Sequence, residues 1–262
     1  AAGEYFFFRQ LIEGQDLQQL KKGTSDAEKV TVSFYVKGNA NATYLVELED
    51  ADNGRLNSQT FDVTTSWTRV IKTFTADTTG ALDNDTSNSI NLVFWLHAGS
   101  TFNGGTHTQN TWASNSTTAN RVPSGNTSIF DSTDREFFLT GVQMEIGSQA
   151  TPFEHRSVGE ELTLCQRYYQ TINPHVNAIY ASGYQANSER VSQVHRLGVE
   201  MRAAPSCTVN GTFTVSNASQ PVFTSFSKNV VCTHFLQNSG SAASGYYHAN
   251  GTDDFFSMDA EL

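Results

Sequence analysis

Residues 137–170 read FFLTGVQMEIGSQATPFEHRSVGEELTLCQRYYQ, and the organisation of the chain follows from this stretch. From Phe138 to Ile146, apolar side chains alternate with polar ones, as in a strand with one buried face. Phe138 and Ile146 both lie on the predicted buried face. Ser157 and Glu160 form a capping box, in which each residue satisfies a free amide at a helix N-terminus. We therefore predict a strand and then a short helix, with β structure on both sides.

Short alternating segments occur both before and after this junction. Residues 30–36 show the clearest alternation, and Asn53-Gly54 favours a tight hairpin because both residues tolerate positive φ angles. The 18 Phe and the many Thr, Ser and Asn suit sheets with hydroxyl-rich outer faces. The predicted fold class is all-β, in three parts: a jelly-roll sandwich over 1–150, a linker with a helix over 151–174, and a β-sandwich domain over 175–262.

The first part contains seven strand segments, counted from Tyr5. A jelly roll of two Greek keys has about eight strands. We therefore expect that an upstream strand is missing from this chain.

The charge balance argues against two classes of partner. The formal net charge is −10, with only 16 Lys and Arg, whereas nucleic acids and anionic bilayers require clustered positive charge. No apolar run approaches the roughly 20 residues of a membrane span. We expect neither nucleic-acid binding nor membrane insertion.

Motifs of the common enzyme classes are missing from the sequence. It contains no Gly-x-Ser-x-Gly elbow, no His-Glu-x-x-His helix, no phosphate-binding loop and no dinucleotide fingerprint. The three cysteines lie too far apart to indicate a zinc site or a disulfide framework. We predict a protein that is not an enzyme and that has no catalytic residues.

No cofactor is predicted, although bound calcium stays an open alternative. Paired acidic residues supply the oxygen ligands that Ca²⁺ prefers, but none of the pairs has the spacing of a calcium-binding loop. Aspartates that cap turns explain the same pattern. The pairs are Asp50/Asp52, Asp83/Asp85, Asp131/Asp134 and Asp253/Asp254.

Two groups of aromatic residues and histidines are candidate ligand-binding residues. The face of a sugar ring packs well on aromatic rings, and rings in a polar loop are costly to leave in water. A simpler alternative is that these rings pack against their own domain or against a neighbouring subunit. The candidates are Phe102, His107 and Trp112 in the irregular segment 99–131, and Tyr246, Tyr247 and His248 near the C-terminus.

The junction also resembles a known family. TGVQMEIGSQATPF at 140–153, together with HRSVGEELTLCQRYYQ at 155–170, resembles a junction in virion structural proteins of tailed phages, notably those that infect marine bacteria and cyanobacteria. The final MDAEL is similar to the end of the same proteins, and weaker similarity covers residues 30–48 and 199–213.

The resemblance implies a role in the virion, which is assembled in the host cytoplasm. Members are tail-fibre, receptor-binding or minor structural proteins whose first domain resembles carbohydrate-binding jelly rolls. It therefore implies host attachment through a surface glycan or receptor, with other virion proteins as partners. Two alternatives stay open: a purely architectural capsid decoration or tail adaptor, and a polysaccharide depolymerase.

The resemblance also implies a homotrimer, because similar fibre proteins are commonly trimers. The predicted helix, residues 160–170, carries a stripe of Leu162, Cys165 and Tyr169. We expect this stripe to meet its copies about a symmetry axis. The alternative is that the helix only covers the end of one sheet.

Overall fold

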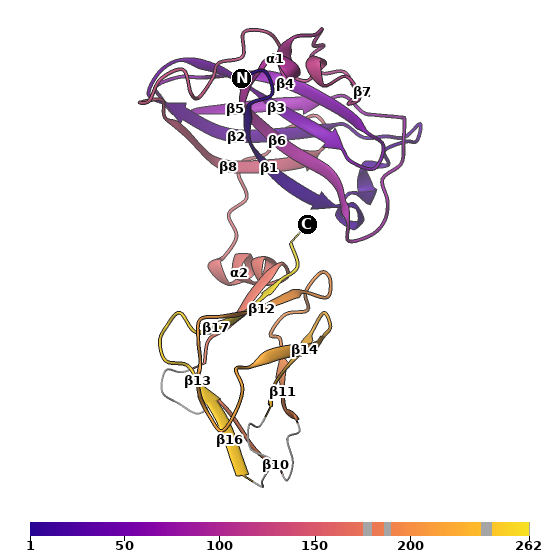
Figure 1. Ribbon diagram of the computed structural model, residues 1–262. Coiled ribbons are helices and arrows are strands. Elements are labelled where there is room, and N and C mark those ends of the chain that lie inside the picture. Colours follow the sequence, from indigo (N-terminus) through magenta and orange to yellow (C-terminus); the bar gives the residue numbers. More distant parts are fainter. Residues whose placement is uncertain (175–179, 186–189, 237–242, 262) are drawn as a thin grey trace. The chain divides into compact units, whose positions relative to one another are not determined.

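The computed structural model describes residues 1–174, 180–185, 190–236 and 243–261. They form two compact units, residues 1–155 and residues 156–261, each built around a hydrophobic core of its own. Both units consist mainly of antiparallel sheets (Figure 1), which confirms the predicted all-β class. No helix in the described part of the chain is long and apolar enough to cross a membrane.

Unit 1 is a sandwich of two sheets. The five-stranded sheet has the order β1-β6-β3-β4-β7 and the three-stranded sheet the order β5-β2-β8. Apolar residues from both sheets form the core between them, where the rings of Phe34 and Phe94 lie 5.0 Å apart. The strands are β1 (Tyr5–Glu13), β2 (Val30–Gly38), β3 (Ala42–Asp50), β4 (Arg55–Val63), β5 (Thr68–Phe74), β6 (Asn88–Ala98), β7 (Ala113–Ser114) and β8 (Phe137–Ile146).

Strand β8 is less regular than its sequence predicts. Gly141 has a φ of 59°, and the pairing with β2 shifts register between residues 140 and 143. This bulge inserts an extra residue, so the inward-facing phase changes from odd to even positions. Leu139 packs on the core before the bulge and Met144 after it. Phe138 and Ile146, both predicted on the buried face, are each 43% exposed. The bulge accounts for Phe138, and Ile146 is the last residue of the strand.

The irregular segment after β6 packs on the outer face of the five-stranded sheet. It contains the short helix α1 (Ser100–Asn103), strand β7 and a 3₁₀ turn at Thr118–Asn120. Val122 and Phe102 from this segment join Val93 and Trp95 of β6 in a small apolar cluster. β7 pairs with β4 at the edge of this sheet (Figure 1). The segment therefore covers part of the outer face of this sheet, which would otherwise be exposed to solvent.

Unit 2 begins with helix α2 (Val158–Gln166), and its capping box forms as predicted. The Ser157 hydroxyl accepts from the Glu160 amide, and the Glu160 carboxylate accepts from the Ser157 amide. The predicted helix extends too far, because Tyr169 lies in strand β9 (Tyr169–Ile172), opposite Asp259. Long-range pairing with β17 overrides the helical spacing there. β9 lies within residues 151–174, which were predicted to be a linker, but it is part of a sheet.

The rest of unit 2 forms three small sheets, ordered β10-β16-β13, β11-β15-β14 and β12-β17-β9. Residues 175–179, at the start of the domain predicted over 175–262, lie outside the described residues. The strands are β10 (Ala181–Gln185), β11 (Arg190–Arg196), β12 (Ser206–Asn210), β13 (Thr214–Ser216), β14 (Val222–Phe226), β15 (Val230–Leu236), β16 (Ala243–His248) and β17 (Phe255–Asp259).

Candidate ligand-binding site

A pocket of about 290 Å³ lies on the outer face of the five-stranded sheet of unit 1. Alternate residues of a strand point to the same face, so positions 5, 7 and 9 of β1 line it together with positions 93 and 95 of β6. The irregular segment 99–122 supplies the remaining wall. The lining residues are Tyr5, Phe7, Arg9, Glu49, Val93, Trp95, Phe102 and Arg121.

One side of this pocket is aromatic. The Tyr5 ring stacks on Phe7 at 5.3 Å and meets the edge of Phe102 at the same distance. Trp95 lies beneath them, 5.1 Å from Phe7, and is only 2% exposed, whereas Tyr5 is 55% exposed. Trp95 is therefore the floor of the pocket, and Tyr5 is the ring that a ligand meets first.

The other side holds one guanidinium and two carboxylates that bind one another. The Arg121 guanidinium donates to the buried Glu47 carboxylate and forms an ion pair of 2.8 Å with Glu49. Burial raises the pKa of Glu47, and this effect outweighs that of the Arg121 guanidinium, which lowers the pKa. Burial alone would also raise the pKa of Glu49, but Arg121 and the amides of Asn91 and Asn115 hold it below its usual value.

Arg9 is the exception among the charged residues of the pocket. Its guanidinium carbon lies 6.0 Å from the centroid of the Phe7 ring, and the residue is exposed. Within the described ranges of the chain, its guanidinium forms neither a hydrogen bond nor an ion pair. It is the one charged group lining the pocket that has no ionic partner in the described part of the chain.

The structure separates the three ligand-binding residues predicted in the irregular segment. Phe102 lines the pocket. His107 lies 2.8 Å through its Nε2 from the Ser58 hydroxyl, and burial lowers its pKa. Trp112 donates from Nε1 to the Thr75 carbonyl at 2.7 Å and packs against the core. Only Phe102 of the three therefore contributes to the pocket.

The candidates near the C-terminus divide in the same way. Tyr247 is fully buried in the core of unit 2, with Phe213 and Phe235 around its ring, so it presents no surface to a ligand. Tyr246 and His248 lie on the opposite face of β16, where their rings stack at 6.2 Å and are partly exposed. Neither of them lines the pocket of unit 1.

Tyr5, Phe7 and Arg9 were not predicted as site residues. The signal was present in the run YFFFR at 5–9, where one residue in two faces the same side of a strand. The neighbours Phe6 and Phe8 are aromatic as well, so the sequence does not indicate which of the two faces bears a site.

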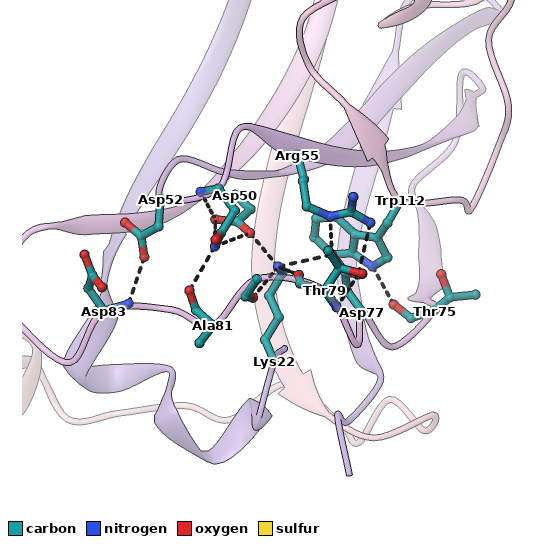
Figure 2. A network of polar contacts seen from close by, with 12 residues as sticks. Lys22, Asp50, Asp52, Arg55, Thr75, Asp77, Thr79, Ala81, Asp83 and Trp112 are labelled. Atoms are coloured by element: carbon teal, nitrogen blue, oxygen red, sulfur yellow. Dashed lines mark hydrogen bonds and ion pairs between the residues drawn. The ribbon is translucent and has the colours of Figure 1, made fainter. Parts of the chain in front are cut away.

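The acidic pair Asp50/Asp52 belongs to a network around a buried lysine (Figure 2). The Lys22 ammonium forms ion pairs with Asp50 and Asp77, and donates to the carbonyls of Thr79 and Gly80 at 2.8 and 3.0 Å. Asp77 is also held by Arg55 through two hydrogen bonds of 2.8 and 3.1 Å. The oxygens that a cation would need here already surround an ammonium group.

The other acidic pairs cap turns or bind neighbouring side chains. Asp85 accepts from the Ser87 amide, Asp131 pairs with Arg135, and Asp254 accepts from the amides of Thr212 and Asn250. In the part of the chain that the structure describes, no group of three or more His, Cys, Asp or Glu converges as a metal site would require.

No protein-family model matches the chain, and no curated protein is similar to it in sequence. Among solved structures, it is similar to the CBM22-1–CBM22-2 tandem domain from the N-terminus of Xyn10C of Paenibacillus barcinonensis, at 11% identity and a TM-score of 0.24. The match covers 98% of this chain and 89% of that one. A TM-score this low establishes neither a shared fold nor a shared ligand.

Proposed function

We propose that the chain is a non-enzymatic structural protein of a tailed-phage virion, of the tail-fibre or receptor-binding class. Unit 1 binds a glycan of the host surface in the pocket on its five-stranded sheet. The virion assignment is supported by the sequence of the junction, residues 140–170. The binding role is supported by one observation above all: an open pocket with exposed aromatic rings on one side and fixed polar groups on the other.

The pocket has the composition that sugars require. Aromatic rings accept the C–H face of a sugar, while a few placed polar groups fix its hydroxyls. Its volume lies at the lower end of the range of about 300–1,000 Å³ for small-molecule sites, which suits a short sugar segment. Tyr5 also borders a second hollow of about 550 Å³, so a longer glycan has room to continue past this ring.

The test is binding of the full-length chain to purified surface glycans of candidate hosts, measured by calorimetry. We expect saturable binding that Tyr5→Ala weakens at least tenfold, because a stacked exposed ring is removed. Trp67→Ala is the matched control, since Trp67 is 51% exposed but lies beside Phe138, away from the pocket. Equal losses in both variants, or no binding by the wild type, would contradict the proposal.

The carboxylates of the pocket do not favour a depolymerase. Glycoside hydrolysis needs an accessible acid with a raised pKa and a second carboxylate across the bond. Glu47 has a raised pKa but is fully buried, and Glu49 borders the pocket but has a lowered pKa. We expect no new reducing ends after prolonged incubation with a glycan that binds; their release would reinstate the enzyme.

An architectural role has one observation in its favour. Phe6 and Phe8 of β1 form an exposed aromatic cluster with Phe130, in which neighbouring rings lie 5.4 and 5.6 Å apart. Such a cluster suits a contact with another virion subunit. Phe8→Ser discriminates between the roles, because Phe8 lines neither hollow: failed particle assembly with glycan binding intact would assign this cluster to architecture, and the pocket to attachment.

A further inference from the structure

We infer that the ligand of the pocket is an acidic glycan, in which a sugar carboxylate pairs with Arg9. The inference rests on the proposed function and names the substrate class of the same site. A carboxylate and a guanidinium form two parallel charge-assisted hydrogen bonds, which a neutral hydroxyl cannot reproduce.

Arg9 has the position that this pairing requires. It lies on the outer face of β1, opposite Val93 of β6, and both residues line the pocket. The face of the Phe7 ring, 6.0 Å from the guanidinium carbon, supports the side chain. A ring that stacks on Tyr5 or Phe102 therefore has a cationic group beside it.

The remaining charges of the pocket do not compete for the ligand. Arg121 is bound to Glu47 and Glu49, and Glu49 also accepts from the amide of Asn91. These three ionic side chains are partnered with one another, and no described residue takes up the hydrogen-bonding capacity of Arg9. Selectivity for a negative group therefore depends on this one arginine.

The acidic character of the whole chain does not oppose the inference. The formal net charge is −10, but charges more than about 8 Å apart in solvent are largely screened at physiological ionic strength. The local balance decides: the formal charges of Arg9, Arg121, Glu47 and Glu49 sum to zero, and Arg9 is the one of these four that has no ionic partner among the described residues. We therefore expect selectivity for carboxylates together with a modest overall affinity.

The experiment compares acidic oligosaccharides with their own methyl esters, which keep every ring and linkage and lose only the charge. Oligomers of galacturonate, glucuronate and mannuronate are titrated into the full-length chain by calorimetry, together with neutral glycans of the same length. We expect at least one acid to bind tenfold or more tightly than its ester, because a charge-assisted pair contributes about 1.5–3 kcal/mol. Arg9→Gln removes this preference, so that in the variant an acid and its own ester bind with equal affinity.

Two controls keep the outcomes distinct. Lys29→Gln removes an exposed cation of unit 1 that does not line the pocket, and should leave the preference intact. Unchanged tryptophan fluorescence shows that Arg9→Gln is folded. If acids and esters bind the wild type equally, or if Arg9→Gln keeps the preference, the acidic-glycan inference is overturned while glycan binding stands. If none of the acidic, esterified or neutral glycans binds, the proposed function itself fails.

Discussion

At the scale of single residues, Lys22 is the most constrained charge of unit 1. Its buried ammonium is surrounded by the carboxylates of Asp50 and Asp77 and by the carbonyls of Thr79 and Gly80. It connects the start of the chain to the turn after β3 and to the segment after β5. Burial would raise the pKa of Asp77, but Arg55, Lys22 and the Thr79 amide together lower it.

Lys22→Met should destabilise unit 1 severely. The substitution keeps much of the apolar volume but leaves Asp50 without its cation, and breaking a buried ion pair costs about 3–5 kcal/mol. All three tryptophans lie in unit 1, so urea unfolding followed by tryptophan fluorescence reports this change directly. Lys29→Met, at an exposed lysine, should change the free energy of unfolding by no more than about 0.5 kcal/mol.

The same variant separates a lysine site from a calcium site. Carboxylate and carbonyl oxygens are calcium ligands. Lys22→Met removes the ammonium from the carboxylates of Asp50 and Asp77 and from the carbonyls of Thr79 and Gly80, although Asn53 and Arg55 still donate to the two carboxylates. We expect millimolar calcium to raise the unfolding midpoint of the variant and to leave that of the wild type unchanged. A calcium-dependent midpoint in the wild type would show that the chain binds the ion elsewhere.

His195 is the corresponding constrained residue of unit 2. Its Nδ1 lies 3.0 Å from the Tyr180 hydroxyl and its Nε2 lies 2.8 Å from the Thr233 hydroxyl, which is itself 3.2 Å from the Tyr247 hydroxyl. Burial lowers the pKa of His195 and raises that of Tyr180 to about 12. The neutral imidazole is therefore part of the folded core.

Unit 2 should lose stability as the pH falls below about 6.5, the pKa of an unfolded histidine. The folded pKa of His195 is lower, so protons bind the unfolded state first and the loss continues as the pH falls through the folded pKa. Its slope is at most about 1.4 kcal/mol per pH unit for this one group. Urea midpoints from circular dichroism between pH 7.5 and 5 measure it.

His195→Gln is the control for this pH dependence, because glutamine keeps a hydrogen-bonding side chain but does not titrate. The slope should flatten in this variant. It should not vanish, because burial and Arg190 also lower the pKa of His234. An unchanged slope in His195→Gln would mean that His195 is not the group responsible.

At the scale of elements, α2 is a helix without a buried face. None of its residues is buried, and its apolar side chains at Val158, Leu162 and Leu164 are exposed, as is Cys165. Helices of this length are marginal in water without packing partners. Its capping box stabilises the N-terminal end. Its exposed apolar side chains are consistent with the predicted contact between copies of the chain.

We expect the full-length chain to form a trimer that depends on α2. Leu162→Glu should shift the mass measured by light scattering from three chains to one, because a buried unpaired charge opposes the contact. Glu161→Gln, on the same helix, should leave the trimer intact. A wild-type monomer at micromolar concentration would contradict the trimer, and an intact Leu162→Glu trimer would place the contact on another element.

At the scale of the whole molecule, the chain consists of two units with separate cores. The core of unit 1 is centred on residues such as Phe34, Tyr44 and Phe61, and that of unit 2 on Phe213, Phe235 and Phe256. Each core is formed by residues of its own unit. Function divides in the same way, since every residue of the candidate pocket belongs to unit 1.

Thermal unfolding should therefore show two transitions. The first evidence would be two calorimetric peaks, of which only one coincides with the change in tryptophan fluorescence. Lys22→Met should lower the temperature of the peak that fluorescence follows and leave that of the other peak unchanged. Acidification to pH 5 should lower the temperature of the peak that fluorescence does not follow. A single peak that both treatments move together would contradict independent cores.

The sequence by itself determined the β class, the position of the junction and the start of α2. These features depend on local periodicity and on a cap of four residues, Ser157 to Glu160, so near neighbours are sufficient to specify them. It also identified one residue of the pocket, Phe102. The alternation at 5–9 contained three more, Tyr5, Phe7 and Arg9, but periodicity does not indicate which face of a strand meets a loop.

Only the tertiary structure decided the site. The ion pair between Arg121 and Glu47 joins residues 74 positions apart, and the pocket combines β1, β3, β6 and the irregular segment. The bulge at Gly141 turned Phe138 outward, pairing with β17 drew Tyr169 from a helix into a strand, and burial removed Tyr247 from the surface. All of these outcomes depend on long-range packing and hydrogen bonding, which local sequence patterns do not contain.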